Sequence, residues 1–269
     1  MEAIRRGFRL LGKSWACLKE DKELLWLPVF SFVGMFLVLA LVGVLGIVVH
    51  AFEQGASRPL QFVFLFLAYF GVYAVAIFFN AAVVGAASIR MNDGNPTIAD
   101  GLKMARGKLG KILQWALLSA SVGVVLRLLE EKAGWVGRLV LGLVGAAWSV
   151  VTFFVVPVIL FEQTDVGGSV KRSAGLFKKS WGEGFVGNGG IGLALFLISL
   201  PIILVSGLLF AVSPLLGGVI GVLALGALFA IGSVLTGIFN TALYRFAANG
   251  DAGEIFETME LRNAFRPKK

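Results

Sequence analysis

Residues 184–244 read GFVGNGGIGLALFLISLPIILVSGLLFAVSPLLGGVIGVLALGALFAIGSVLTGIFNTALY, a run of 61 residues without a charged side chain. The hydrocarbon core of a bilayer is about 30 Å thick, so a membrane-spanning helix needs about 20 apolar residues. As one helix this run would be roughly 90 Å long, so it has to fold back on itself. Ser213-Pro214 near its middle is the natural turn. The stretch therefore predicts two membrane spans joined by a short turn.

Four shorter runs before this stretch have the same character. They are residues 24–52, 59–89, 112–126 and 139–161, none of which carries a fixed charge. Three of them are long enough for one span each, but 112–126 has only 15 residues. It reaches span length if Lys111 and Arg127 are included and extend toward the membrane surfaces. The predicted fold class is therefore all-α, a polytopic membrane bundle of six transmembrane helices.

The composition excludes most other classes of protein. Hydrophobic residues make up 58% of the 269 and charged residues 15%, with a mean hydropathy of +0.88, whereas soluble domains have about 45–50% and about 25%. One histidine, His50, and one cysteine, Cys17, are too few for a zinc site of the usual kind. No H-E-x-x-H, G-x-S-x-G or P-loop pattern occurs. We therefore expect a protein that is not an enzyme and holds no cofactor or metal.

Positive charge is concentrated on one side of the predicted bundle. With six spans, the N-terminus, the loops around 90–111 and 163–184 and the C-terminus share a side, which holds 20 of the 24 Lys and Arg residues. The positive-inside rule places this side in the cytoplasm. We expect both termini there, in a prokaryotic plasma (inner) membrane, with the positive charge directed at lipid and not at nucleic acid. Cys17 is then expected to react with an impermeant maleimide only from the cytoplasmic side.

The basic segments resemble one another. Residues 4–15, IRRGFRLLGKSW, align without gaps with residues 170–181, VKRSAGLFKKSW, and residues 102–111 are a weaker third copy. Each copy precedes a pair of predicted spans. The pattern predicts a single integral membrane domain over residues 1–269, built from three repeats of an amphipathic interfacial helix and a transmembrane hairpin. The repeats cover roughly 1–97, 98–165 and 166–269.

In residues 4–15 and 170–181, apolar and basic residues occupy different faces of a helix. Phe8, Leu11 and Trp15 fall at helical spacing, which is typical of a helix that lies in the membrane interface near anionic headgroups. The alternative is that the segments are elbows that join spans and pack on their own protein. The residues expected at the lipid interface are Arg5, Arg6, Arg9, Lys13, Trp15, Lys171, Arg172, Lys178, Lys179 and Trp181.

Polar residues inside the spans are further candidates, because intramembrane polar groups are costly. Asn80 and Asn240 take comparable positions in the second and sixth spans. They would either line a polar path or form interhelical hydrogen bonds, and in both cases we expect them to face protein or a polar cavity. Arg127 and Glu131 are i,i+4 partners, which would either neutralise each other or mark a pore mouth.

Proline and glycine indicate where the helices bend and approach. Pro157 and Pro201 lie inside predicted spans, where each removes a backbone hydrogen bond and is expected to bend its helix. Gly217 and Gly221 form a small-xxx-small pair, a pattern that supports close helix packing within or between chains.

Three short stretches carry a resemblance to a known family. Residues 78–82 (FFNAA), 153–157 (FFVVP) and 170–174 (VKRSA) are similar to segments of uncharacterised prokaryotic six-span membrane proteins, catalogued as a domain of unknown function. The resemblance covers nearly the whole chain and implies the fold but no activity. A looser likeness is to the membrane domain attached to some bacterial glycerophosphodiester phosphodiesterases. This chain lacks their catalytic barrel, so that activity is not implied.

Two functions remain open. The first is an oligomeric channel- or transporter-like protein for an ion or a lipid-like substrate, which the repeats and intramembrane polar residues favour. No span carries an acidic residue at mid-depth, which disfavours ion-coupled pumping. The second is a membrane organiser or scaffold whose basic amphipathic helices bind anionic lipid or a cytoplasmic partner. The expected partners are therefore anionic membrane lipids and further copies of the chain in a homo-oligomer.

Overall fold

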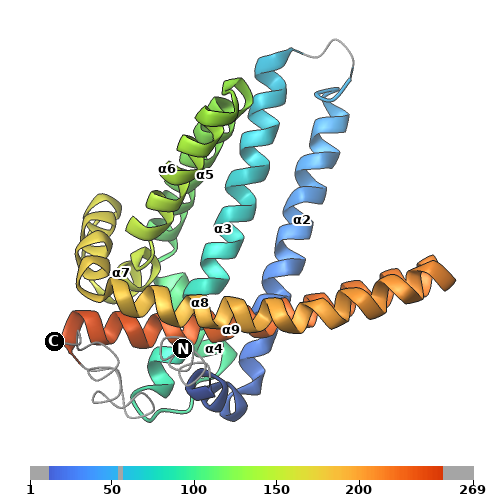
Figure 1. Cartoon of the computed structure of the whole chain (residues 1–269). Helices are drawn as coiled ribbons and strands as arrows, with labels where there is room; N and C mark the ends of the chain where they lie inside the picture. The colour runs from blue at the N-terminus through green and yellow to red at the C-terminus, as the bar shows by residue number, and fades with distance from the viewer. Residues whose placement is uncertain (1–11, 54–56, 251–269) are drawn as a thin grey trace. The chain divides into compact units, whose positions relative to one another are not determined.

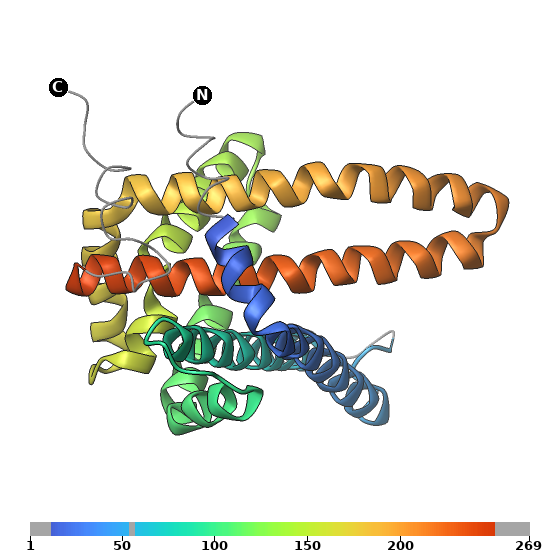
Figure 2. The ribbon, with the colours of Figure 1, turned by 90° about the horizontal axis from the view of Figure 1, so that it is seen from below.

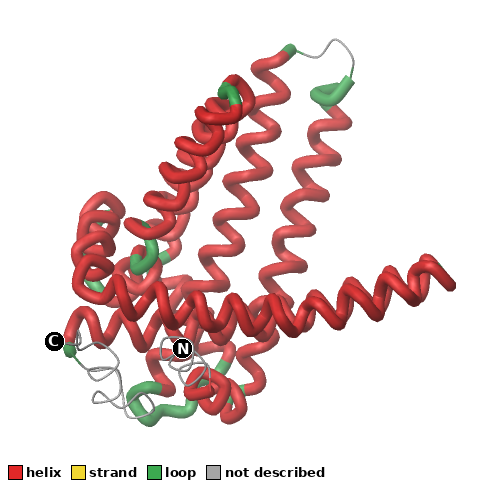
Figure 3. The backbone as a smooth tube through the Cα atoms, viewed as in Figure 1, coloured by secondary structure: helices red, strands yellow, loops and turns green. Residues whose placement is uncertain are grey.

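A computed structural model describes residues 12–53 and 57–250 of the chain, and at 179–190 it describes the backbone alone. Within these residues every regular element is a helix and no strand occurs (Figure 3), which confirms the all-α fold class. Residues 12–20 are helical. The elements that follow are the 3-10 helix η1 (Lys22–Leu25), α2 (Trp26–Val48), α3 (Arg58–Arg90), α4 (Ile98–Gly107), α5 (Leu109–Lys132), α6 (Trp135–Val151), α7 (Val155–Phe161), α8 (Val166–Val212) and α9 (Pro214–Asn249).

Six segments of the described chain are helical, long and apolar enough to cross a membrane. They are Lys22–Val48, Arg58–Arg90, Leu109–Lys132, Trp135–Phe161, Ile191–Val212 and Pro214–Asn249. Each predicted run overlaps one of these segments, and the run 184–244 overlaps the last two. The third reaches 24 residues because α5 continues past both Lys111 and Arg127, as expected.

The chain divides into two compact units, and the boundaries between them fall within four of the helices labelled in Figure 1, α2, α3, α4 and α8. The terminal unit contains the chain up to Pro28, residues Ala86–Ile98 and the chain from Lys178 onward. The central unit contains Val29–Gly85 and Ala99–Phe177. Each unit is described by itself below.

In the terminal unit, α8 and α9 form an antiparallel hairpin, which is clear in Figure 2. The hairpin turns at Ser213-Pro214, as the sequence predicts. Ser213 caps α9 by accepting a hydrogen bond from the Leu216 backbone N–H at 3.5 Å, and Pro214 occupies the first helical position, where its missing N–H costs nothing. Local chemistry therefore decides where the long apolar run reverses.

The glycine pair of α9 packs inside this hairpin. A Cβ atom built on Gly217 would lie 2.2 Å from the Phe210 backbone nitrogen, and one built on Gly221 would lie 3.2 Å from the Ser206 Cβ. Both glycines are buried. The small-xxx-small pair thus allows α8 and α9 of one chain to approach closely.

In the central unit, small residues and aromatic rings hold the spans together. A Cβ atom on Gly71 of α3 would lie 2.4 Å from a methyl carbon of Val38 on α2, so the absent side chain makes room for the neighbour. Trp115 of α5 stacks on Trp148 of α6 with 5.9 Å between ring centroids. Because lipid tails are as apolar as these side chains, such packing is what stabilises a membrane bundle.

The fourth span is discontinuous. Its helix is interrupted at 152–154, between α6 and α7, and not at Pro157, where we expected the bend. The reason is local: a proline lacks the N–H that would bond the carbonyl four residues earlier, and its ring collides with that carbonyl, which belongs to Phe153. The freed backbone N–H of Phe154 donates to the Oγ of Ser173 on α8 at 2.9 Å. By contrast, α8 continues through Pro201.

The three basic segments join their spans differently. Helix 12–20 is separated from α2 by the 3-10 helix η1, and α4 is separated from α5 by Lys108, which has non-helical backbone angles. The segment at 170–181 is not separated from its span, because both lie within α8, a single helix of 47 residues.

Candidate functional site

Helix α4 is the amphipathic element of the central unit. Gly101 and Ala105 are buried, while Lys103 and Arg106 are exposed, so apolar and basic residues occupy separate faces. Arg106 lies in the last turn of the helix, where a cation is favoured by the helix dipole. The helix contains the first part of residues 102–111, the stretch that we compared with residues 4–15 in the sequence.

Gly85 of α3 allows α4 to pack closely. A Cβ atom on Gly85 would lie 3.1 Å from both the Cβ and the sulfur of Met104, which is tighter than ordinary van der Waals contact. The surrounding part of α3, from Ala81 to Ala87, is buried. A short helix that follows a membrane span is thereby held against that span, with its basic face outward.

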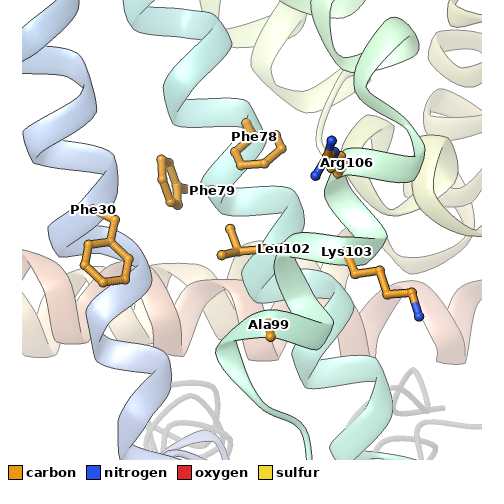
Figure 4. Close-up of a pocket in the computed structure, with 7 residues that line it drawn as sticks. All are labelled: Phe30, Phe78, Phe79, Ala99, Leu102, Lys103 and Arg106. Carbon is orange, nitrogen blue, oxygen red and sulfur yellow. The ribbon is translucent and has the colours of Figure 1, made fainter.

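An open pocket of about 540 Å³ lies where α2, α3 and α4 meet. Its wall is largely apolar, and two cations complete it. The lining residues are Phe30, Phe78, Phe79, Ala99, Leu102, Lys103 and Arg106. Figure 4 shows Phe79 and Leu102 directed toward α2, which carries Phe30, while Lys103 extends away from this apolar group. The volume is within the range of about 300–1,000 Å³ that is usual for small-ligand pockets.

Three of the residues that line the pocket, Phe30, Phe78 and Phe79, belong to segments long and apolar enough to cross a membrane. Phe79 precedes the end of α3 at Arg90 by 11 residues, about 16 Å along the helix axis. Phe30 is on the second turn of α2. Lys103 and Arg106 are on α4 outside the spans. The pocket thus joins apolar side chains of two candidate spans to a helix, α4, that carries two exposed cations.

Within the described residues, Lys103 and Arg106 have no ion-pair partner, although other arginines of the chain do. Arg90 bonds Asp21, and Arg172 donates to Glu162 at 2.9 Å. Exposed cations without a carboxylate partner are available to an external anion. This availability and the apolar wall beside it make the α4 pocket the candidate site.

The Arg90 cluster, in the terminal unit, has a structural geometry. Arg90 donates from Nε to Asp21 Oδ2 at 2.6 Å and from Nη2 to both Asp21 Oδ1 and Asn95 Oδ1, the latter at 2.8 Å. Its Nη1 lies 3.5 Å from Glu20. The Asp21 side chain is only 2% exposed. These bonds tie the end of helix 12–20 to the end of α3, which are 69 residues apart in the sequence.

Cys17 lies in the same cluster and is buried. Burial, reinforced by the negative charge of Asp21, raises the pKa of its thiol to about 12. Labelling of Cys17 by a maleimide from the cytoplasmic side stays a prediction, and we expect it to be slow in the folded protein, because the reactive thiolate is scarce and the sulfur is covered.

The expected interfacial residues of the first segment are described only in part. Trp15 is exposed, with Lys19 Nζ 5.9 Å from its ring centroid, and Lys13 is half-buried and interacts with a neighbouring group. Arg5, Arg6 and Arg9 lie outside the described residues.

The start of α8 combines an anchored face with an exposed one. Ser173 is fully buried against the break in the fourth span. Lys171 and Lys178 are exposed, whereas Arg172 is engaged by Glu162. The side chains of Lys179 and Trp181 lie outside the described residues. The segment is thus an elbow on one face and carries exposed cations on the other.

The predicted intramembrane polar residues divide into a pair and two separate amides. Arg127 lies 3.6 Å from Glu131, which confirms the i,i+4 pair, and donates from Nη1 to the Tyr69 hydroxyl at 2.7 Å. Asn240 is half-buried and interacts with a neighbouring group. Asn80 is exposed in the single chain, because the neighbouring alanines occupy the buried positions of that turn, and the expectation that Asn80 faces protein or a polar cavity stays a prediction.

The described residues contain no group of three or more His, Cys, Asp or Glu side chains placed to hold a metal ion. His50 contacts Glu53 at 2.6 Å in an exposed turn. The α4 pocket contains no carboxylate or hydroxyl among its lining residues. The lining offers apolar side chains and two cations.

Comparison with known proteins gives the family and no activity. A family model described as a family of unknown function (DUF6159) matches residues 59–255. The match covers more than half of the chain, which belongs to this family. It includes α4 and all of the pocket residues except Phe30. None of the curated proteins matches the sequence.

Proposed function

We propose that this member of the DUF6159 family is a non-enzymatic membrane organiser whose basic interfacial helices bind anionic lipid headgroups. The observation that carries the proposal is the pair Lys103 and Arg106 on α4, which are exposed, have no ion-pair partner among the described residues and lie next to an apolar pocket. Each cation near an anionic membrane surface contributes about 1 kcal/mol at modest salt. Lys171 and Lys178 on α8 add two more exposed cations.

The proposal includes an orientation and a compartment. The side of the chain with 20 of the 24 basic residues faces the cytoplasm of a prokaryotic cell, with both termini inside. The chain is built from three repeats, and the basic segment of each lies in the cytoplasmic interface of the plasma membrane.

The orientation is tested with introduced cysteines in place of the buried native one. In a Cys17→Ser background, Ala16→Cys and Lys132→Cys place exposed thiols on opposite sides of the proposed topology. An impermeant maleimide should label the Lys132→Cys variant in intact cells and the Ala16→Cys variant only after permeabilisation. The reverse pattern would overturn the orientation.

A second candidate is an oligomeric channel- or transporter-like protein for an ion or a lipid-like substrate. The discontinuous fourth span supports it, because broken helices are common at the binding sites of transporters. The hydrogen bond from the Phe154 backbone N–H to Ser173 closes this break with protein, which supports a static role instead. The geometry therefore favours the membrane organiser over the channel or transporter.

Lipid binding is tested on the purified full chain with a variant that lacks four exposed cations. The variant carries Lys103→Gln, Arg106→Gln, Lys171→Gln and Lys178→Gln. Native mass spectrometry with added phosphatidylglycerol should show binding weakened by about several hundredfold, since each of the four charges contributes about 1 kcal/mol. Binding of phosphatidylcholine should not change.

The matched control removes charge from the other side of the proposed topology. Lys132 and Arg138 are both exposed, and Lys132→Gln with Arg138→Gln should change phosphatidylglycerol binding by less than twofold. Equal losses in the two variants, or no loss in the fourfold variant, would reject headgroup binding by the basic helices.

A further inference from the structure

The α4 pocket has an apolar wall that headgroup binding alone does not use. The inference drawn from this wall rests on the proposed function. Phe30, Phe79 and Leu102 face a common space of about 540 Å³, and they come from three different helices. Phe79 also lies close to Gly34 of α2, since a Cβ atom built on Gly34 would lie 3.8 Å from the Phe79 ring. The wall is therefore built by tertiary contacts within the central unit, with Lys103 and Arg106 at its border.

We infer that this pocket is a discrete site for one anionic diacyl phospholipid of the surrounding bilayer. One acyl chain lies against Phe30, Phe79 and Leu102, and the phosphate is bound by Lys103 and Arg106. A basic surface alone attracts anionic lipid diffusely. The pocket adds a place in which one molecule is held with its chain and its headgroup in defined positions.

The elements that build the wall favour a lipid as the occupant. A soluble anion would meet the two cations but would leave the apolar wall unfilled, whereas Phe30 and Phe79 of that wall belong to segments long and apolar enough to cross a membrane, where acyl chains are the neighbouring molecules.

Charge, and not the apolar wall, decides which lipid is held. An acyl chain that moves from the bilayer into an apolar pocket exchanges one hydrocarbon environment for another, so the wall alone does not discriminate among lipids. The two unpaired cations favour a headgroup with net negative charge over a zwitterionic one. The inference therefore names anionic phospholipids as a class, with a preference of about fivefold from each cation.

Photo-crosslinking in vesicles tests this site directly. The full chain, with p-benzoylphenylalanine in place of Phe79, is reconstituted into phosphatidylcholine that contains a minor fraction of phosphatidylglycerol. After irradiation, mass spectrometry identifies the lipid attached to the protein. The adduct at position 79 should contain phosphatidylglycerol enriched about tenfold or more over its fraction in the vesicle.

The control probe replaces Phe36, which lies on the same helix as Phe30 and is 65% exposed. Its adduct should reflect the bulk lipid ratio. Lys103→Gln with Arg106→Gln should return the adduct at position 79 to the bulk ratio without lowering its yield. Leu102→Trp, which fills the pocket, should lower the yield at position 79 at least fivefold and leave the yield at position 36 unchanged.

These results separate the pocket from the proposed function. A bulk lipid ratio at position 79 would overturn the discrete site, even if the fourfold glutamine variant loses phosphatidylglycerol and the basic helices bind headgroups as proposed. Enrichment at position 79 that survives Lys103→Gln with Arg106→Gln would also overturn it, because the selectivity would then come from elsewhere.

Discussion

Arg90 and the α4 cations Lys103 and Arg106 count equally in the charge of the sequence, but their surroundings are opposite. The Arg90 side chain is 16% exposed and holds the buried Asp21 carboxylate with two hydrogen bonds. Lys103 and Arg106 are exposed and unpaired among the described residues. One cation therefore serves as a structural tie, while the other two are available to a ligand. Mutations should separate these roles.

The largest expected effect is on stability at the Arg90 tie. Arg90→Ala leaves the Asp21 carboxylate, which is 2% exposed, without its partner, and breaking a buried pair in this way costs about 3–5 kcal/mol. Denaturation of the detergent-solubilised full chain should show this loss. Asp21→Asn combined with Arg90→Gln should recover part of it, because no charge is then left unpaired.

The α4 cations provide the comparison for this experiment. Lys103→Ala and Arg106→Ala should each change the free energy of unfolding by less than about 0.5 kcal/mol, as is usual for exposed positions. If they destabilise the chain as much as Arg90→Ala does, the division into structural and available cations is wrong.

Cys17 reports on the same cluster through its reactivity. A thiol pKa raised from 9.0 to about 12 lowers the thiolate fraction at neutral pH about a thousandfold, since each pKa unit is a factor of ten. Maleimide labelling of the native chain should therefore be slower than labelling of the denatured chain by about that factor. The rate should keep rising with pH up to about 12, because the reactive form is the deprotonated one. A plateau near pH 9 would show that the cluster is open.

The hydrogen bond from the Phe154 backbone N–H to Ser173 is an uncharged counterpart of the bond between Arg90 and Asp21. Ser173→Ala removes the acceptor of the Phe154 backbone N–H, and an unsatisfied buried donor costs about 1–3 kcal/mol. The matched control is Ser149→Ala, because Ser149 is exposed and donates only to the Gly145 carbonyl of its own helix. Thermal unfolding should resolve a loss for Ser173→Ala and almost none for the control. Equal values would mean that the break is satisfied in another way.

A small effect is also expected at Arg127. Its ion pair with Glu131 joins two side chains that are each more than half exposed, and exposed helix pairs of this kind contribute little to stability. Arg127→Gln should therefore lower the free energy of unfolding far less than Arg90→Ala does, even with loss of the bond to Tyr69. High salt should reduce the difference between wild type and variant. A loss as large as that of Arg90→Ala would place Arg127 in the buried class.

The spans could be predicted because they depend on local composition. Any uncharged run of sufficient length becomes a helix in a bilayer, since every backbone group must be satisfied within the segment, and Ser213-Pro214 carries the chemistry of a helix start in two residues. The bend of the fourth span was placed a few residues late, at Pro157, because the proline acts on the carbonyl four residues before it.

The candidate site could be predicted only in part. Residues 102–111 were recognised as a basic copy, but nothing in their spacing indicated that Leu102 would face Phe30 and Phe79. The cations predicted at the interface did not include Lys103 and Arg106. Exposed and paired cations look alike in a sequence, since their difference depends on which carboxylate is brought near.

The sequence by itself determined the helical class, the six apolar segments and the turn of the last hairpin, because each depends on residues within one or two helical turns or on the thickness of the bilayer. Only the tertiary structure decided that Arg90 is bound by Asp21, 69 residues away, that Ser173 closes the break at Phe154, and that three helices enclose the pocket beside Lys103. These contacts join residues distant in the chain, and their energies depend on which groups are brought out of water or lipid together. Composition and spacing do not contain that information.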